Sequence, residues 1–187
     1  MKKETIEIRW HGRGGQGAIT AAKIVAGAAF ESGYKGVVMA PTFGTERRGA
    51  PVFTSLKLSR EKIYDLSPIQ QPDILVILDY LLMDEPGVLT GLKPGGLIVV
   101  NSPKPPQMHL VEGMRVAAAD VTELAASVGL PTGIVNSGII GSFAKAAGLL
   151  DIDLLAGKIE EEFKGKKSRA NAEAARLCYV KTTMGDD

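Results

Sequence analysis

Cysteine and histidine are scarce in this sequence: its 187 residues include one cysteine, Cys178, and two histidines, His11 and His109. A single cysteine excludes an internal disulfide framework, and it excludes an iron–sulfur cluster or structural zinc site held wholly by cysteines of this chain. No paired spacing of histidine, cysteine and carboxylate residues suggests another metal site. We therefore predict no metal site in this chain, and we expect it in a reducing compartment, the cytoplasm.

Neither sign of charge dominates, because 22 Lys and Arg residues face 21 Asp and Glu residues and leave a net charge of +1. This balance excludes a global basic field for nucleic acid, and the chain has no polybasic stretch for anionic lipid. Its longest apolar runs, such as ILVIL and LIVV, are far too short to cross a bilayer. The sequence thus predicts a soluble protein without nucleic-acid or membrane partners, in which any anion site is local.

The length fits one domain over residues 1–187, with a sheet core over about 4–150 and a C-terminal helical part over about 151–183. Strand-like and helix-like segments alternate through the first two thirds, which predicts an α/β fold with a Rossmann-like, doubly wound, mostly parallel sheet. Gly33 is placed to end the first helix. The expected strands are TIEIRWH, GVVMA, DILVILD, GGLIVVNS and MRVAAAD.

Residues 52–65 predict an antiparallel addition to this sheet. VFTSLKL and KIYD flank the polar tetrapeptide SREK, a pattern typical of a β-hairpin or of two consecutive strands. Later in the chain, Asp120 and Glu123 form a plausible N-terminal cap for the helix that follows.

A glycine-rich loop, HGRGGQG at residues 11–17, separates the first strand from the first helix. Gly12, Gly14 and Gly17 match the dinucleotide-binding spacing G-x-G-x-x-G. Such a loop lies at the carboxyl edge of the sheet, where the helix N-terminus presents free amides to an anion. The alternative is a tight turn whose glycines only let the helix pack on the sheet. The candidate ligand-binding residues here are Gly12, Arg13, Gly14, Gly15, Gln16 and Gly17.

One part of the dinucleotide site is missing. A nicotinamide cofactor needs an acidic residue at the end of the second strand to bind the ribose hydroxyls. Met39 and Ala40 occupy that place, and the first acid, Glu46, lies within a loop. An NAD(P)-binding oxidoreductase is therefore disfavoured, although it stays an alternative.

The second candidate loop, PTFGTERRGAPV at residues 41–52, is expected to leave the same edge of the sheet. If the segment is extended, Arg47 and Arg48 point in opposite directions. One arginine can then face the crevice, while the other faces a partner or pairs with Glu46. A solvated surface loop is the simpler alternative. The candidate ligand-binding residues here are Glu46, Arg47, Arg48 and Gly49.

Two asparagines complete the candidate site. Asn101 ends a buried strand at the ligand edge, where a plain turn residue is equally expected. Asn136 precedes SGIIGSF, and we interpret it as a helix cap, with a cofactor or partner contact as the alternative. His11 borders the glycine loop, where a structural hydrogen bond is favoured over a ligand contact. Cys178 is expected to be a buried packing residue, and we assign no catalytic residue.

The two loops, IRWHGRGGQGAITAA and PTFGTERRGAPV, together with the helix between them, closely resemble the gamma subunit of 2-oxoacid:ferredoxin oxidoreductases. The likeness extends through PDILVILD, GGLIVVNS and IVNSGIIGSFAKAAG and so covers nearly the whole chain. The resemblance implies a Rossmann-like subunit, inactive alone. The complex would oxidatively decarboxylate a 2-oxoacid to an acyl-CoA while reducing ferredoxin.

The resemblance also implies where the cofactors lie. Thiamine diphosphate and magnesium would sit on alpha and beta subunits, and [4Fe-4S] clusters on beta and delta subunits, with nothing covalently bound here. The gamma loops would bind coenzyme A through the loop amides, Arg13 and Arg47 or Arg48, or would dock on a partner subunit. A homodimer is expected where two complexes assemble. The 2-oxoacid stays open, as do two rival functions: a stand-alone NAD(P)-binding oxidoreductase and a non-catalytic nucleotide-binding or structural module.

Overall fold

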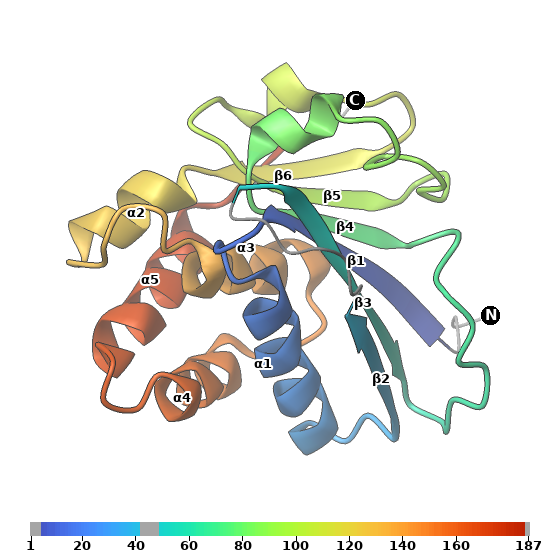
Figure 1. Ribbon diagram of the computed structural model, residues 1–187, viewed down its shortest axis with the longest axis horizontal. Coiled ribbons are helices and arrows are strands. Elements are labelled where there is room, and N and C mark those ends of the chain that lie inside the picture. The colour runs from blue at the N-terminus through green and yellow to red at the C-terminus, as the bar shows by residue number, and fades with distance from the viewer. Residues whose placement is uncertain (1–4, 42–48, 186–187) are drawn as a thin grey trace.

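A seven-stranded sheet runs through the part of the chain that the computed structural model describes, residues 5–41 and 49–185 (Figure 1). Its strands follow the order β2-β3-β1-β4-β5-β6-β7. The strands are β1 (Thr5–Arg13), β2 (Gly36–Pro41), β3 (Pro51–Ser59), β4 (Ile74–Ile77), β5 (Leu97–Asn101), β6 (Arg115–Ala119) and β7 (Thr183–Gly185). The helices are α1 (Ala18–Glu31), α2 (Val121–Ser127), α3 (Asn136–Ala147), α4 (Ile152–Glu162) and α5 (Ser168–Lys181), with short 3-10 helices η1 (Tyr80–Asp84) and η2 (Pro106–His109).

The sheet is mixed, with a parallel centre. Strands β1, β4, β5 and β6 pair in parallel, one after another. Strand β3 is antiparallel to both β1 and β2, so that β2 runs in the same direction as β1. The α/β fold class, with a parallel centre of the sheet, an antiparallel addition and C-terminal helices, is therefore confirmed. The short strand β7, which pairs antiparallel with β6, was not predicted.

The antiparallel addition is built in part from the segment that we predicted, since VFTSLKL lies in β3. It consists of β2 and β3, whereas residues 62–65 form no strand, so the second strand expected within 52–65 is wrong. The reason is that β1 and β2 occupy both edges of β3 and leave no backbone edge with which a further strand could pair. The segment is instead tied down by Lys57, whose Nζ donates to the carbonyl oxygen of Asp65 (3.3 Å).

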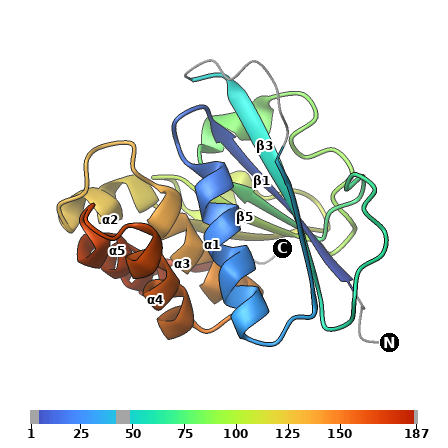
Figure 2. The same cartoon turned by 60° about the horizontal axis from the view of Figure 1, so that its bottom comes forward.

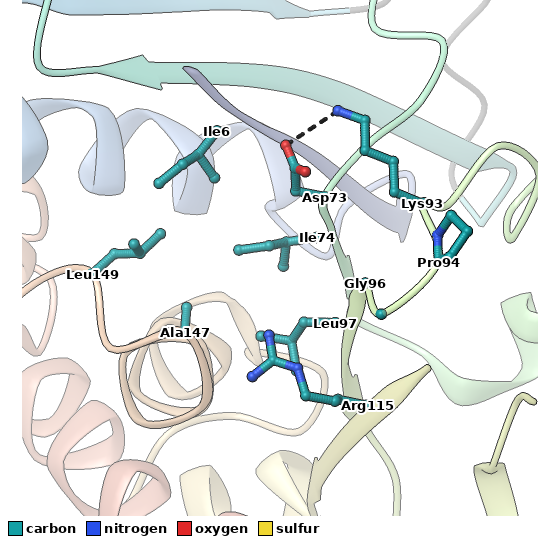
Figure 3. Close-up of a pocket in the computed structure, with 11 residues that line it drawn as sticks. Ile6, Asp73, Ile74, Lys93, Pro94, Gly96, Leu97, Arg115, Ala147 and Leu149 are labelled. Atoms are coloured by element: carbon teal, nitrogen blue, oxygen red, sulfur yellow. Dashed lines mark hydrogen bonds and ion pairs between the residues drawn. The ribbon is translucent and has the colours of Figure 1, made fainter. Parts of the chain in front are cut away.

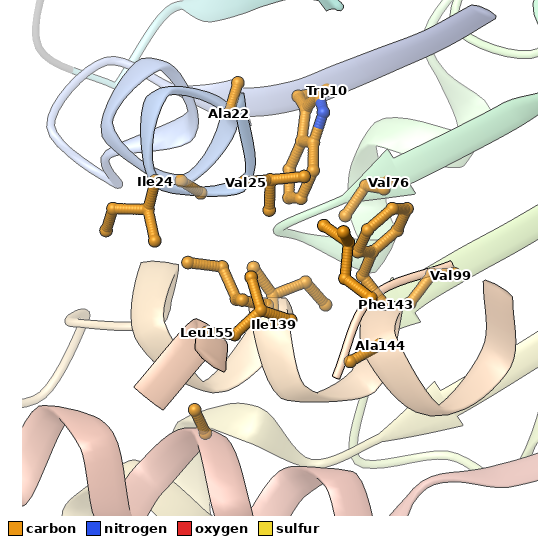
Figure 4. Close-up of a cluster of buried hydrophobic side chains, with 14 of the residues drawn as sticks. Trp10, Ala22, Ile24, Val25, Val76, Val99, Ile139, Phe143, Ala144 and Leu155 are labelled. Carbon is orange, nitrogen blue, oxygen red and sulfur yellow. The ribbon is translucent and has the colours of Figure 1, made fainter. Parts of the chain in front are cut away.

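The α-helices gather on one face of the sheet (Figure 2). Alternate residues of β1 point to this face, where Trp10 is fully buried and its ring centroid lies 5.3 Å from that of Phe143 on α3. Val76 and Val99, from the neighbouring strands, lie beside them (Figure 4). This aromatic and β-branched layer fixes α1 and α3 against the centre of the sheet.

The opposite face carries a second apolar cluster. Leu75, Ile77 and Ile98 are completely buried there, and η1 and the turns after it cover them. Because β4 and β5 are covered on both faces, they have the continuous apolar sequences that we read as doubly buried strands. The predicted cap also forms, since Asp120 Oδ1 accepts a hydrogen bond from the Glu123 amide (3.0 Å).

Helices α3 and α5 approach each other closely through small residues. A Cβ atom added to Gly141 on α3 would overlap the carbonyl oxygen of Ala175 on α5. A backbone atom cannot move aside as the end of a flexible side chain can. Gly141 therefore sets the distance between these helices.

A Gly141→Ala substitution should lower the free energy of unfolding by about 3 kcal/mol or more, because α3 and α5 must move apart to admit the methyl group. Gly157→Ala is the matched control, since a Cβ there meets nothing within 4 Å on the exposed side of α4. The control should gain up to about 1 kcal/mol from its better helix propensity. Urea unfolding measures both, and equal effects of the two substitutions would contradict the packing role.

Candidate functional site

The glycine loop turns β1 directly into α1 at the carboxyl edge of the parallel strands. Gly15 has φ +95° and Gly17 has φ +80°, in the left-handed region that L side chains rarely adopt. Gly17 occupies the N-cap position of α1, and within residues 5–41 and 49–185 no side chain caps this helix. The first amides of α1 therefore keep their hydrogen-bonding capacity for another acceptor, and the positive end of the helix dipole lies with them.

Gln16 closes the turn from inside. Its Oε1 accepts a hydrogen bond from the Arg13 amide (2.7 Å), and its own amide donates to the Arg13 carbonyl oxygen (2.9 Å). The side-chain oxygen of Gln16, one of the candidate ligand-binding residues, is thus used in a hydrogen bond within the loop itself. This fixes the backbone of the turn.

Arg13 is held at the end of β4. Its Nε donates to Asp79 Oδ2 (2.7 Å), and Asp79 Oδ1 accepts a hydrogen bond from the Leu81 amide (3.0 Å) at the start of η1. Arg13 Nη1 lies 3.4 Å from the carbonyl oxygen of Gly49. The ion pair leaves Arg13 at the mouth of the loop but offsets part of its charge. We did not predict Asp79 as a site residue from the sequence. Its position directly after the buried strand DILVIL could have indicated it.

The second candidate loop reaches the glycine loop, as expected. The Gly14 amide donates to the carbonyl oxygen of Ala50 (2.8 Å), and the Gly49 amide donates to that of Gly14 (3.1 Å). The two loops are thus joined by a pair of backbone hydrogen bonds. The remaining candidates of this loop, Glu46, Arg47 and Arg48, lie outside the described residues.

Asn136 packs on the crest of the glycine loop. It is buried, and a Cβ atom added to Gly17 would lie 2.7 Å from its Nδ2. Val135 holds the N-cap position and Asn136 is the first helical residue, so the predicted cap is wrong by one position. Its Oδ1 accepts from the next amide, that of Ser137 (3.0 Å), while Nδ2 has no recorded acceptor within residues 5–41 and 49–185. The N-termini of α1 and α3 therefore meet at this point.

The side chain of Asn101 forms hydrogen bonds within its own chain. Its Nδ2 donates to the carbonyl oxygen of Leu78 (2.9 Å) and to Thr122 Oγ1 (3.1 Å), and its Oδ1 accepts from the Thr122 amide (3.3 Å). These bonds tie the end of β4 to the start of α2. The structure thus gives Asn101 a positioning role at the ligand edge.

The hollow above the glycine loop has a volume of about 190 Å³. Backbone of the loop and the first turn of α1 form its floor, and Val52 of β3 forms one wall. This composition suits an anionic group that accepts hydrogen bonds from main-chain amides. Its lining residues are Arg13, Gly14, Gly15, Gly17, Ala18, Ile19 and Val52.

A second hollow, of about 240 Å³, lies at the opposite edge of the sheet, near the start of β4 and β5 (Figure 3). Its lysine, Lys93, is already paired with Asp73 Oδ2 (3.4 Å) and Glu7 Oε2 (3.0 Å). This hollow lies away from the edge where the predicted residues gather. We therefore place the candidate site at the glycine loop.

His11 lies beside the loop but on the other face of β1. Its ring is buried and stacks on Phe53 with the centroids 5.7 Å apart. Within the described part of the chain its Nε2 has no hydrogen-bond partner, so the expected structural hydrogen bond is not found at that atom. Burial, with the nearby charge of Arg9, lowers the pKa of His11 to about 4. The ring is therefore neutral at neutral pH.

Cys178 is buried as expected, and burial together with the charge of Asp120 raises the pKa of its thiol to about 12. His109 lies in η2, where its Nε2 is 2.7 Å from Ser102 Oγ. Across residues 5–41 and 49–185, no three His, Cys, Asp or Glu side chains gather closely enough to hold a metal ion. In the same residues, no helix has the length and apolar character needed to cross a membrane.

The lowered pKa of His11 predicts a loss of stability in acid. Below pH 6.5 the unfolded chain takes up a proton that the folded chain refuses until about pH 4, so unfolding becomes easier across this window. The shift corresponds to roughly 3 kcal/mol. Denaturant unfolding at pH 7.5 and 4.5 should show a clearly smaller acid loss for His11→Gln than for the parent chain. An acid loss of the same size in both chains would contradict the assignment.

Known proteins similar to this chain carry related names. Residues 7–180 match the family described as pyruvate ferredoxin/flavodoxin oxidoreductase. The chain is 43% identical over 184 residues to the "Pyruvate/ketoisovalerate oxidoreductases common subunit gamma" of Pyrococcus furiosus, with 96% of this chain and 98% of that protein aligned. It is 44% identical over 177 residues to the "Pyruvate synthase subunit PorC" of Methanothermobacter marburgensis, with 94% and 97% aligned.

A solved structure has the same fold. The crystal structure of the pyruvate oxidoreductase subunit PORC from Thermotoga maritima superimposes with a TM-score of 0.84 at 29% sequence identity. The match covers 98% of this chain and 100% of that subunit. The fold of this chain is therefore that of a whole subunit.

Proposed function

The chain belongs to the pyruvate ferredoxin/flavodoxin oxidoreductase family, and from this premise we propose that it is the gamma subunit of a 2-oxoacid:ferredoxin oxidoreductase. The complex converts a 2-oxoacid and coenzyme A to an acyl-CoA and carbon dioxide while ferredoxin is reduced. The partners are alpha, beta and delta subunits in the cytoplasm, and two such complexes assemble into a larger dimer. The gamma subunit is inactive alone.

The observation that carries this proposal is the open tip of α1. The glycine loop and the first turn of α1 line the hollow above it together with Arg13, and no side chain of the described residues caps the helix. A diphosphate or the 3′-phosphate of coenzyme A accepts hydrogen bonds from such amides and gains from the helix dipole and from the guanidinium group. The glycines are needed because a Cβ at Gly17 would collide with Asn136 and because Gly15 has a positive φ.

The proposed ligand contacts come from both joined loops. Gly12 and Gly14 shape the turn, and Gln16 holds it through its hydrogen bonds to Arg13. The amides of Gly15 and Gly17 would donate to the anion, and Asn136 Nδ2 is a further donor at the crest. Gly49 reaches the loop through its bond to Gly14. Glu46, Arg47 and Arg48 complete the proposal from the sequence, and Asn101 positions the edge on which the ligand rests.

The redox chemistry belongs to the partner subunits. Thiamine diphosphate and magnesium are proposed for alpha and beta, and the [4Fe-4S] clusters for beta and delta. The one cysteine of this chain supports this division, because its thiol is buried and protonated and offers no thiolate ligand. We assign no catalytic residue here, so this chain would bind and orient coenzyme A and help to close the active site.

The competing reading of the same loops is docking. Pro51 is exposed beside the hollow, and the backbone pair between the loops presents a stiff edge that could seat a partner subunit. In that case Arg13 and the two arginines of the second loop would form ion pairs across an interface. Binding of coenzyme A and assembly of the complex can be measured separately, so the two readings are distinguishable.

The strand order further disfavours an NAD(P)-binding oxidoreductase. In a dinucleotide-binding fold the strand that carries the ribose acid lies beside the first strand. Here β3 lies between β1 and β2, which moves the end of β2 away by about one more strand spacing, ~5 Å. A nicotinamide ribose on the glycine loop would therefore find no acid from β2.

The names of the relatives favour pyruvate and 2-ketoisovalerate as substrates. Purification of the assembled complex, followed by assays with individual 2-oxoacids, coenzyme A and a viologen dye, tests this choice. The expected result is coenzyme A-dependent dye reduction with pyruvate, with a branched-chain oxoacid, or with both. Activity of this chain without partners would overturn the proposal.

A charged side chain introduced at position 15 should distinguish coenzyme A binding from docking on a partner subunit. We expect Gly15→Asp to weaken the binding of coenzyme A to the complex at least about 10-fold, because a carboxylate would face the phosphates at short range. Gly15→Asn is the matched control, since it has the same shape and the same positive φ without the charge. Titration calorimetry with the assembled complex measures the affinity.

The outcome has two informative alternatives. If Gly15→Asp and Gly15→Asn bind coenzyme A equally well, the phosphates do not lie on this loop. If Gly15→Asp fails to join the complex while Gly15→Asn assembles, the loop is a docking element. Size-exclusion chromatography of the mixed subunits separates these results.

A further inference from the structure

A separate cavity of about 240 Å³ lies on the face of the sheet opposite α1. Its floor is β1, one wall is the start of β3, and the other wall is η1 with the turn that follows it. Apart from Arg9, His11 and Glu85, its lining side chains are apolar. The lining residues are Arg9, His11, Gly12, Pro51, Val52, Phe53, Leu82, Glu85, Pro86, Gly87 and Val88.

Arg9 brings a positive charge to this cavity, and no carboxylate of the described residues, Glu85 included, forms an ion pair with it. Its Nη2 donates to the carbonyl oxygens of Val88 (3.3 Å) and Thr90, which hold the guanidinium in one orientation. Within residues 5–41 and 49–185, Arg9 makes no ion pair. Burial lowers its pKa, so the half-buried guanidinium is partly desolvated, with no carboxylate of the described residues paired to it.

Within the described residues, the neighbouring lysines on the same face are paired with carboxylates, unlike Arg9. Lys57 is buried and lies 3.7 Å from Glu7 Oε1 and 3.6 Å from Asp65 Oδ2. Lys93 is paired with Glu7 and Asp73. The fold thus supplies both lysines with carboxylates, whereas the partners of Arg9 among the described residues are neutral carbonyl groups.

The rest of the cavity suits a short apolar chain. Leu82 and Val88 are buried at its side, and Phe53 is partly exposed across from them. The His11 ring stacks on Phe53 and is neutral, so it adds a polar edge without charge. Glu85 also lines the cavity, and its side chain is exposed to solvent.

We propose that this cavity binds a small carboxylate that carries a short apolar chain, with the carboxylate on the Arg9 guanidinium and the chain between Phe53, Leu82 and Val88. A guanidinium already oriented by two carbonyl groups loses little entropy when it binds a carboxylate. The volume limits the ligand to a few carbon atoms beyond the carboxylate. This site is distinct from the anion hollow of the glycine loop, although Val52 lines both.

The test uses the full chain and three probes, followed by NMR. Isobutyrate has the charge and the chain, isobutyramide has the chain without the charge, and acetate has the charge with almost no chain. The buried Nε–H of Arg9 is a suitable reporter because it has no acceptor within the described residues. We expect saturable shifts with isobutyrate, at an affinity at least about 10-fold higher than for isobutyramide or acetate.

Two variants locate the binding. Arg9→Gln should weaken isobutyrate binding about 10-fold or more, whereas Arg9→Lys, which keeps the charge, should retain more of it. The amide spectrum of each variant reports whether it is folded. If Arg9→Gln does not fold, the comparison of isobutyrate with isobutyramide on the parent chain still tests whether the carboxylate charge contributes to binding.

Three results would overturn the proposal. One is the absence of any saturable shift with isobutyrate. Another is equal affinity for the acid and its amide, which would remove the role of the charge. The third is equal affinity for acetate and isobutyrate, which would reduce the site to a general anion contact.

Discussion

Strand β1 carries a buried side chain on each face near its carboxyl end, Trp10 on one and His11 on the other, and the placement of the candidate sites follows from this. Trp10 points to the layer of α1 and α3, while Arg9 and His11, the residues on either side, point to the opposite layer. The strand lies between β3 and β4, which hydrogen-bond to both of its edges. Its end at Arg13 is therefore rigidly placed, and the glycine loop that follows projects from a fixed point.

Three chain segments that are distant in sequence converge on that loop. Asp79 at the end of β4 pairs with Arg13, Ala50 before β3 pairs with Gly14, and Asn136 at the start of α3 packs on Gly17. Each contact restricts what the loop can bind. The backbone of the turn is tied down from three sides, while no side chain of the residues that the structure describes caps the amides at the tip of α1. A preorganised row of donors of this kind favours an anion without a large cost of ordering.

Family membership and geometry bear on different parts of the function. The family indicates an oxidoreductase complex, and the buried, protonated Cys178 supports an assignment of the iron–sulfur clusters to other subunits. The geometry supports an anion-binding role at the glycine loop but does not require coenzyme A to be the anion. The Arg9 cavity stands apart from both, since it depends on a desolvated cation and apolar walls on the far side of β1.

The sequence by itself determined the fold class, the strands β4 and β5, the glycine turn and the Asp120 cap, because periodicity, continuous apolar runs and cap residues act over a few neighbouring positions. Only the tertiary structure decided that β3 lies between β1 and β2, because strand order depends on which edges find partners. The same holds for the Arg13–Asp79 pair, for Asn136 against Gly17 and for the place of Arg9 in its cavity. Such contacts join residues far apart in the chain, and no local pattern encodes their distance.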